Sequence, residues 1–230
     1  MAYTLSSGPG SRPRLNRDSV LAGAVALADR AGMEGLTMRT LAQELGVVPM
    51  ALYKHVANKD ELIDGMVDIV WSEVELPDAT EGWRPAIRAR AVSLRDALTR
   101  HRWAVGLMES RLQPGPANLR QHNAMLGCLR RSGFSFRTTV HVTSALDAYV
   151  YGFALQEKTL PFDTPEESGR VAAQKRSTQP ETAAQDYPYL IEVVVELGQQ
   201  GYDYGVEFAV GLDLILDGVE RLRPEWVQAE

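Results

Sequence analysis

The stretch that decides the fold is GLTMRTLAQELGVVPMALYKHVANKDELIDGMV, which runs from Gly35 to Val67. Thr37 stands where a helix can be capped, and apolar residues follow it at helical spacing. Gly46 can form a sharp turn because glycine adopts positive φ without strain, and Pro49 suits the first turn of another helix. The stretch therefore predicts two short helices joined by a tight turn.

The small and apolar residues of this hairpin have the order of a helix-turn-helix. That motif needs a small residue where its helices cross, a glycine between them, and apolar residues that hold both against a preceding helix. Ala42, Gly46 and Leu52 meet these demands in turn. A buried helical hairpin with no role in DNA binding has the same pattern, so that alternative stays open.

Helical periodicity continues on both sides of the hairpin. Asn16 or Asp18 can cap a first helix, and Asn58 can begin a fourth that continues to about Val74. Further helical patterns cover residues 85–101, 103–112, 117–132, 137–158, 189–199 and 202–222. No strand pattern and no internal repeat is evident. The sequence predicts an all-α fold, with a three-helix N-terminal domain that contains the helix-turn-helix and a larger helical domain.

Composition marks the boundaries of these parts. Residues 1–15 are small and polar and include arginines, so we expect a flexible basic arm. Residues 16–59 form the expected helix-turn-helix domain, and residues 60–230 the expected ligand-binding and dimerisation domain. Within the latter, residues 159–187 lack periodicity and are rich in Pro, Glu, Thr, Gln and Ser, which predicts a mobile loop.

Charge is distributed unevenly between the two ends. The formal net charge is −6, but residues 1–59 hold seven Lys or Arg against four Asp or Glu. A basic head on an acidic body suits a protein that touches a polyanion with one end only. Arg12, Arg14 and Arg17 could follow a DNA groove, and a solvated tail is an equal alternative.

Several classes of protein are disfavoured. Cys128 is the only cysteine, so neither an intrachain disulfide nor a cysteine zinc cluster is possible. We see no bilayer-length apolar run and no secretory signal, and we expect a cytoplasmic protein without membrane contact. No phosphate loop or nucleophile elbow is present, and the four histidines lack metal-binding spacing. We therefore expect no enzyme, no catalytic or metal site and no cofactor.

The hairpin and its flanks resemble the DNA-binding signature of the TetR family of bacterial repressors. The matching residues are Gly35-Leu36-Thr37, Leu41-Ala42, Leu45-Gly46-Val47, Leu52-Tyr53-x-His55-Val56 and Asn58-Lys59-x-x-Leu62. Residues 98–102, 133–135 and 152–155 look like the effector domain of the tetracycline-repressor branch. The resemblance covers most of the chain from about Asn16, and it implies a double-stranded DNA operator and a small-molecule effector as partners.

The resemblance implies roles for individual residues of the head. Arg39 would read a guanine edge, for which its planar fork is well suited. Apolar residues begin the recognition helix and can contact thymine methyl groups. Tyr53 and the lysines would contact phosphates, although Tyr53 could instead pack and the lysines could be solvated. The expected DNA-binding residues are Thr37, Arg39, Thr40, Pro49, Met50, Ala51, Tyr53, Lys54, His55 and Lys59.

The same resemblance implies an effector pocket in the body. The tetracycline branch binds its drug with magnesium through a histidine and a glutamate, and Met108 and Gln156 occupy those places here. Methionine cannot bind a hard cation and glutamine is a weak ligand, so no tetracycline–magnesium site is expected. The expected lining is Arg90, Leu94, Trp103, Met108, Arg111, Met125, Leu129, Val140, Thr143, Asp147 and Gln156. Each of these could equally be ordinary core.

The family resemblance also implies a homodimer, whose two recognition helices lie about 34–36 Å apart on a palindromic operator. Apolar stripes along residues 140–154 and 208–222 are candidates for the dimer surface, and core packing is the alternative for both. We expect a repressor that an organic effector releases from DNA. A DNA-binding adaptor controlled by a protein partner, without a real pocket, is the alternative function.

Overall fold

The computed structural model describes residues 15–162, 164–177 and 183–226, and within those ranges every regular element is a helix. The basic arm expected at residues 1–15 lies outside this part except for Leu15. The elements are α1 (Arg17–Gly35), α2 (Met38–Glu44), α3 (Pro49–Leu52), α4 (Lys59–Ser72), the 3₁₀ turn η1 (Ala79–Glu81), α5 (Trp83–Arg100), α6 (Pro116–Arg131), α7 (Phe136–Lys158), α8 (Pro165–Ser177), α9 (Ala183–Asp186), α10 (Pro188–Gln200) and α11 (Tyr204–Trp226). The all-α prediction is confirmed.

Polar side chains cap the N-termini of the first helices. The Asn16 side chain accepts a hydrogen bond from the Ser19 backbone N–H at 2.8 Å, and the Thr37 hydroxyl accepts one from Thr40 at 3.1 Å. Asn58 caps α4 in the same way. Each cap satisfies a backbone donor that has no partner within its helix. Helix α1 is interrupted near its end, where Gly32 has a φ of 69°.

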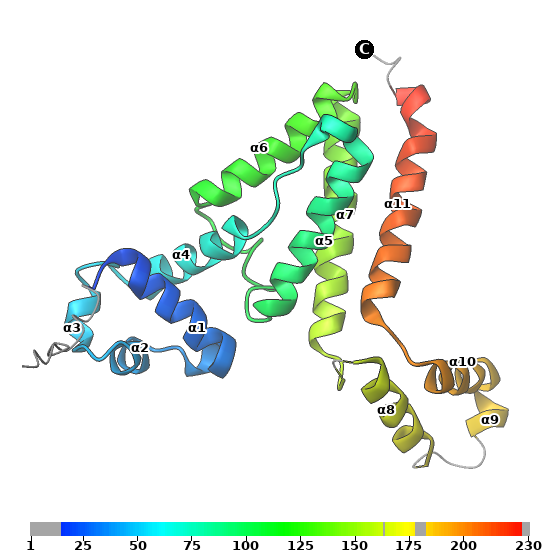
Figure 1. Cartoon of the computed structure of the whole chain (residues 1–230), viewed down its shortest axis with the longest axis horizontal. Helices are drawn as coiled ribbons and strands as arrows, with labels where there is room; N and C mark the ends of the chain where they lie inside the picture. Colours follow the sequence, from blue (N-terminus) through cyan, green and yellow to red (C-terminus); the bar gives the residue numbers. More distant parts are fainter. Residues whose placement is uncertain (1–14, 163, 178–182, 227–230) are drawn as a thin grey trace, which may run out of the picture.

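The helices form a small head and a larger body (Figure 1). Helices α1, α2 and α3 make the head, and α4 runs from it into the body. In the body, α5, α7 and α11 lie side by side, and α6 crosses beside α4, α5 and α7. Helices α8, α9 and α10 form a separate group below α7 and α11, where α8 packs against α10.

One apolar core continues from the head into the body. Leu21, Leu41 and Leu52 are buried in the head, and Trp71 at the end of α4 is buried in the body. Burial of such side chains contributes roughly 1.5–3 kcal/mol each. On the outer side of the body, Arg84 on α5 forms ion pairs with acidic residues of α11, so polar contacts add to the apolar packing between these helices.

Two segments differ from the sequence prediction. Residues 103–112 were expected to be helical, but they form consecutive turns, with Ala104 N–H bonded to His101 C=O at 2.8 Å. Long-range contacts of Trp103 and Arg111 hold this segment in place of a helical ladder. Residues 159–187 were expected to form a loop without helices, but α8 and α9 lie there. Pro165 and two glutamates favour a helix start, which composition alone obscured.

Within the described ranges, no helix combines the length and apolarity that a bilayer crossing requires.

Candidate DNA interface and effector chamber

The turn of the helix-turn-helix has the geometry that its sequence predicts. Gly46 has a φ of 67°, a left-handed conformation that side chains disfavour. The Val47 N–H donates to the Ala42 carbonyl at 2.9 Å and closes the end of α2. Helix α3 then begins at Pro49, and its regular part ends at Leu52, earlier than the predicted end near Val56. Turn hydrogen bonds from Lys54 and His55 extend it.

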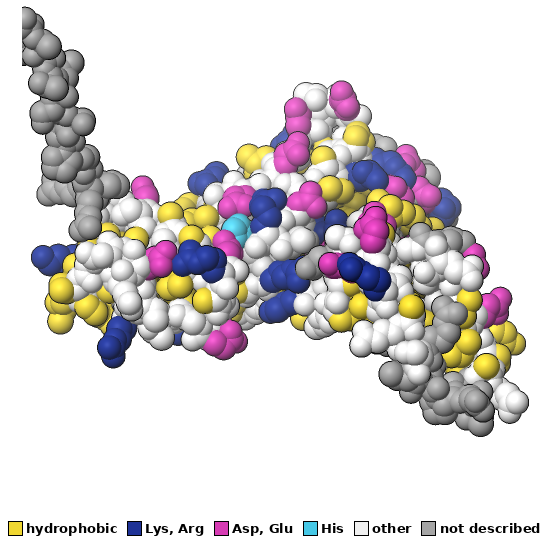
Figure 2. All heavy atoms as spheres, turned by 60° about the horizontal axis from the view of Figure 1, so that its bottom comes forward, with side chains coloured by type: hydrophobic (Ala, Val, Ile, Leu, Met, Phe, Trp, Pro, Cys, Tyr) yellow, Lys and Arg dark blue, Asp and Glu magenta, His cyan; other side chains and the backbone are white. Residues whose placement is uncertain are grey.

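Several of the predicted DNA-binding residues have exposed side chains. Arg39, in the first turn of α2, is exposed, and Met50 at the start of α3 is 72% exposed. Tyr53 and Lys54 follow on the exposed side of the turn after α3. Figure 2 shows basic side chains beside an apolar patch at this end of the molecule. The arrangement offers a fork for base edges, methyl-binding surface and cations for phosphates.

Several of the predicted residues have roles within the fold as well. Thr37 caps α2, and the Thr40 hydroxyl donates to the Gly35 carbonyl at 2.8 Å, so both shape the entry into α2. Lys59 is the exposed first residue of α4. His55 is half-buried behind α3, with its backbone N–H bonded to Leu52 at 2.8 Å. The ten predicted residues thus lie on α2, on α3, in the segments beside these helices and at the first residue of α4.

The body holds a second candidate site, which we call the polar chamber and define by six buried side-chain atoms without a hydrogen-bond partner. Burying a polar atom without a partner costs roughly 1–3 kcal/mol, so such atoms mark places where a ligand or water is expected. The chamber lies between α4, α5, α6 and α7. The six atoms are Trp71 Nε1, Arg90 Nε, Gln121 Oε1, Thr143 Oγ1, Asp147 Oδ1 and Tyr151 Oη.

The chamber is electrostatically paired at its centre. Arg90 is 2% exposed, and its guanidinium lies 3.9 Å from the Asp147 carboxylate and over the Trp71 ring at 5.9 Å. Burial lowers the pKa of Arg90, against the opposing effect of Asp147. Burial likewise raises the pKa of Asp147, and burial together with Glu109 raises the pKa of Tyr151. The chamber thus offers both charged donors and charged acceptors in a buried setting.

The structure places the predicted lining residues in three groups. Arg90, Thr143 and Asp147 belong to the polar chamber. The apolar members are buried core residues, namely Leu94, Met108, Met125 and Leu129. The others point elsewhere: Val140 and Gln156 are exposed, while Trp103 bonds to Asp29 of α1 and Arg111 to Asp64 of α4.

Sequence reasoning missed three members of the chamber. Tyr151 continues the series of Thr143 and Asp147 at four-residue spacing along α7, and that periodicity was a usable signal. Trp71 and Gln121 come from α4 and α6, and only tertiary packing brings them to the chamber. The Gln121 amide donates to the Val74 carbonyl, which leaves its own carbonyl oxygen unpartnered.

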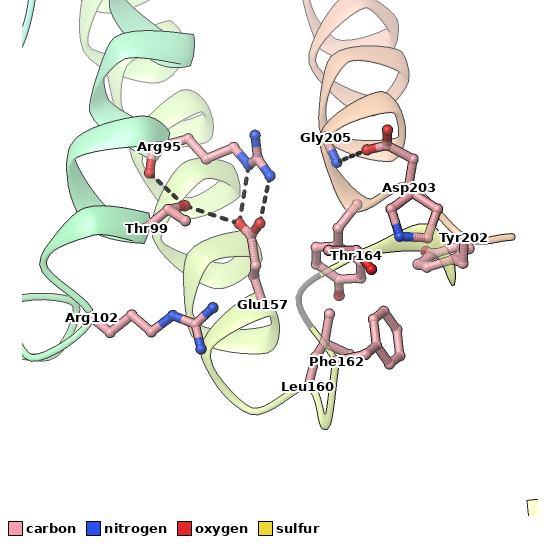
Figure 3. Close-up of a pocket in the computed structure, with 12 residues that line it drawn as sticks. Arg95, Thr99, Arg102, Glu157, Leu160, Phe162, Thr164, Tyr202, Asp203 and Gly205 are labelled. Atoms are coloured by element: carbon pink, nitrogen blue, oxygen red, sulfur yellow. Dashed lines mark hydrogen bonds and ion pairs between the residues drawn. The ribbon is translucent and has the colours of Figure 1, made fainter. Parts of the chain in front are cut away.

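A cavity of about 280 Å³ lies outside the chamber, between the ends of α5 and α7 and the start of α11 (Figure 3). Glu157 extends into it and accepts hydrogen bonds from Arg95 at 2.5 and 3.0 Å. Tyr202 lines the opposite side, and burial raises the pKa of its hydroxyl. Because Arg95 holds the Glu157 carboxylate, this cavity is a poor site for a hard cation.

Helix α4 joins head and body through acidic side chains. Asp68 accepts hydrogen bonds from the backbone N–H groups of Ala117 and Asn118 at 2.9 and 3.1 Å, and so caps α6 from another helix. A Cβ on Gly115 would lie 2.3 Å from Asp68, so this close approach requires glycine. A movement of α4 would therefore break these hydrogen bonds or move the N-terminus of α6 with it.

The head and the body each match a known protein family. Residues 20–66 match the family described as "Bacterial regulatory proteins, tetR family", and residues 76–223 match "Tetracyclin repressor-like, C-terminal domain". The HTH-type transcriptional repressor DrrR1 of Streptomyces coeruleorubidus is 32% identical over 220 residues, which cover 93% of this chain and 80% of that protein. The class D tetracycline repressor protein of Escherichia coli is 34% identical over 148 residues, covering 63% of this chain and 67% of the repressor.

Solved structures agree with the sequence matches. The TetR family protein ActR of Streptomyces coelicolor, in complex with actinorhodin, has a TM-score of 0.74 at 28% identity, covering 90% of this chain and 96% of that one. A single-residue variant of TetR from Acinetobacter baumannii AYE, in complex with minocycline, has a TM-score of 0.66 at 28% identity and covers 91% and 95% of the two chains. The head, the body and their order along the chain all match these regulators. The chain therefore belongs to the TetR family of helix-turn-helix transcriptional regulators.

Proposed function

We propose that this chain is a homodimeric repressor that binds a palindromic operator and leaves it when a small organic effector enters the polar chamber. The observation that carries the effector half of this proposal is the set of six buried, unpartnered polar atoms between α4, α5, α6 and α7. The exposed end of the head, with Arg39 and the start of α3, supports the operator half.

Operator recognition depends on few residues. The start of α3 is apolar, so Met50 and Ala51 can contact thymine methyl groups but cannot donate hydrogen bonds from their side chains. Arg39 can bind a guanine edge with two donors. Tyr53 and the two lysines of the head supply phosphate contacts, which give affinity and position but little sequence information. One head is therefore too small to specify a site, and two heads on a palindrome solve this.

Exposed apolar faces on α7 and α11 support the dimer. Val206, Val210 and Leu214 lie at four-residue spacing on α11 and are more than half exposed. Phe136 and Val140 are exposed on α7. Side-chain rows of this kind on two adjacent helices suit a four-helix bundle with a second copy. This exposed row is not the stripe expected at residues 208–222. Most described members of that stripe are buried within one chain and belong to the core, namely Phe208, Leu212, Leu216 and Val219.

The chemistry of the chamber supports an uncharged effector with both an acceptor and a donor. Arg90 and Asp147 offset each other within the chamber, and the charge of Glu109 also acts on both, so a negatively charged ligand would be disfavoured there. A carbonyl oxygen can accept from Arg90 Nε or Trp71 Nε1, and a hydroxyl can donate to Asp147 Oδ1. A compound with a carbonyl and a hydroxyl group could therefore accept from Arg90 and donate to Asp147.

The residues present argue against a tetracycline–magnesium effector. Met108 has no oxygen or charge to offer a hard cation, and the Gln156 amide oxygen already accepts a hydrogen bond from Tyr204 at 3.2 Å. A metal-free ligand is therefore the better fit for this body.

One observation favours the adaptor alternative. Met108 and Met125 are buried, and the cavity beside Met108 measures about 10 Å³, enough for roughly one water molecule. A body filled in this way suits control by a protein partner. The unpartnered atoms of the chamber weigh more heavily, because a permanently filled core has no reason to leave six polar groups unsatisfied.

A two-step experiment tests the effector. The purified protein is screened against metal-free organic compounds by thermal shift, and each hit is added to a preformed complex with an operator selected from random palindromic DNA. A compound that binds the chamber should release the operator from the wild-type protein. Asp147→Asn should lower the affinity of the protein for that compound by about tenfold or more. Asp96→Asn, an exposed change on α5, is the matched control. Hits that stabilise the protein but release no DNA, or a screen without hits, would favour the adaptor.

A further inference from the structure

The contact between head and body includes one buried histidine that faces two carboxylates. His101 follows the last residue of α5 and is 6% exposed. Its Nδ1 lies 2.8 Å from Asp29 Oδ1 on α1, and its Nε2 lies 3.1 Å from Glu73 Oε1 at the end of α4. One ring therefore touches the DNA-binding head, the connecting helix and the body together.

This geometry selects one protonation state. A carboxylate only accepts hydrogen bonds, whereas a neutral imidazole has a single N–H and would leave one carboxylate facing a lone pair. The imidazolium form donates from both nitrogens and adds a positive charge between two negative ones. The protonated ring therefore satisfies both carboxylates, and the neutral ring satisfies only one.

The surrounding charges support the same state. Among the described residues packed around the ring, α1 supplies Asp29, α4 supplies Glu73, and α5 supplies Arg100, which donates to Glu73 at 2.8 Å. Burial alone would raise the pKa of Glu73, but the Arg100 hydrogen bond and the charge of His101 hold that pKa below its ordinary value of 4.5. When the His101 ring is protonated, its charge and that of Arg100 balance the two carboxylates, Asp29 and Glu73.

A second, uncharged bond runs parallel to the histidine. The Trp103 indole N–H donates to the same Asp29 oxygen at 2.7 Å. The indole N–H does not ionise between about pH 6 and pH 8.5, so this hydrogen bond keeps its donor throughout that range. The contact therefore contains one titratable and one fixed bond to a single carboxylate, and these can be separated by mutation.

We propose that His101 is a proton-dependent latch, whose protonated ring ties the DNA-binding head to the body and makes operator binding depend on pH. The proposal rests on the proposed function, with the effector-free arrangement as the one that binds DNA. Protonation strengthens the latch, because only the protonated ring donates to both carboxylates, so a lower pH favours the latched arrangement. Glu73 stays ionised throughout that change and does not contribute to it.

The test is operator affinity at about pH 6 and about pH 8.5, a range over which histidine side chains in proteins commonly change charge. It uses the full chain, constant ionic strength and an operator selected from random palindromic DNA. Wild type should bind about tenfold more weakly at the higher pH, the scale of one lost charge-assisted hydrogen bond. His101→Gln and Asp29→Asn should each reduce that pH ratio to about twofold or less.

Trp103→Phe is the matched control, because it removes the fixed bond to Asp29 and keeps the titratable one. It should weaken binding at both pH values and leave their ratio as in wild type. If His101→Gln or Asp29→Asn kept the wild-type ratio, the latch would be refuted. If wild type bound no selected DNA at either pH, the regulator function itself would fail. Thermal unfolding gives a DNA-free check: His101→Gln should lower the Tm more at about pH 6 than at about pH 8.5.

Discussion

In the proposed operator complex, we expect base reading to depend more on one side chain, Arg39, than on the recognition helix α3. Arg39 is the exposed arginine in the first turn of α2, while α3 begins with proline, methionine and alanine. The side chains of these three residues offer no hydrogen-bond donors. We therefore expect base discrimination by hydrogen bonds to fall largely to Arg39, with phosphate and methyl contacts from the rest of the head.

Arg39→Ala should accordingly weaken operator binding by roughly 1–3 kcal/mol and relax the base preference at one position of each half-site. Fluorescence anisotropy with the selected operator and its single-base variants measures both effects. Arg131→Ala, which removes an exposed arginine at the end of α6 in the body, is the control and should change neither. An unchanged affinity of the Arg39 variant on every sequence would contradict the assigned role.

The buried pair of Arg90 and Asp147 yields a prediction about stability. Arg90→Met leaves the Asp147 carboxylate buried without its partner and should lower the free energy of unfolding by roughly 3–5 kcal/mol. The double change to Arg90→Met with Asp147→Leu removes both charges and should recover most of that loss. Urea unfolding of wild type and the two variants decides this. A double variant as unstable as the single one would mean that the pair is not coupled as described.

The sequence predicts the roles of residues that act on near neighbours in the chain, but not of residues whose roles depend on tertiary packing. Asn16, Thr37 and Asn58 could be identified as caps, and Gly46 as the turn, because each acts on its near neighbours in sequence. Trp71 could not be assigned to the polar chamber, because its position there depends on packing of α4 against helices later in the chain.

Helix α4 connects the head to the body, beside the direct contacts of His101 and Trp103 with Asp29 of α1. It contributes Asp64 and Asp68 to contacts with the body, and its end carries Glu73. Most other helices were predictable from caps and apolar periodicity. The turns at 103–112 were not, because their apolar residues have helical spacing although tertiary contacts fix them otherwise. Helix α8 was missed because it is mostly polar and packs against α10, which lies later in the chain.

The cap that α4 provides to α6 can be tested by removing it. Asp68→Ala leaves the N–H groups of Ala117 and Asn118 without their acceptor and should lower the free energy of unfolding by roughly 0.5–2 kcal/mol, the range for lost helix caps. Urea unfolding measures the change. Glu192→Ala on the exposed side of α10 is the comparison and should lie within about 0.5 kcal/mol of wild type. A stability equal to that of the comparison would show that the cap contributes nothing.

The described residues include two unlike outer surfaces, an end of the head with exposed basic and apolar side chains and an apolar face on α7 and α11. The chamber lies between them, beside the helix that joins them. Charge asymmetry and the family pattern made this division predictable. Which face of α11 is outward was not, because both of its faces carry apolar residues and only the packed structure distinguishes core from surface.

The apolar face of α11 should hold two copies together. Val210→Glu with Leu214→Glu places charges on that face and should convert a dimer into a monomer that binds the operator at least about a hundredfold more weakly. Sedimentation velocity measures the state and anisotropy the affinity. Glu192→Lys with Glu196→Lys on α10 serves as a control that alters charge elsewhere. A double glutamate variant that stayed dimeric would place the interface on another face.

The most direct test of the central claim is sequence-specific DNA binding by the intact protein. An operator is selected from random palindromic DNA, and its affinity is compared with that of a duplex of equal length whose half-sites are scrambled, over a series of salt concentrations. The account predicts at least about a thousandfold preference for the operator, and affinity that falls steeply and linearly on logarithmic axes as salt rises. Equal affinity for the two duplexes, or no consensus from the selection, would contradict it.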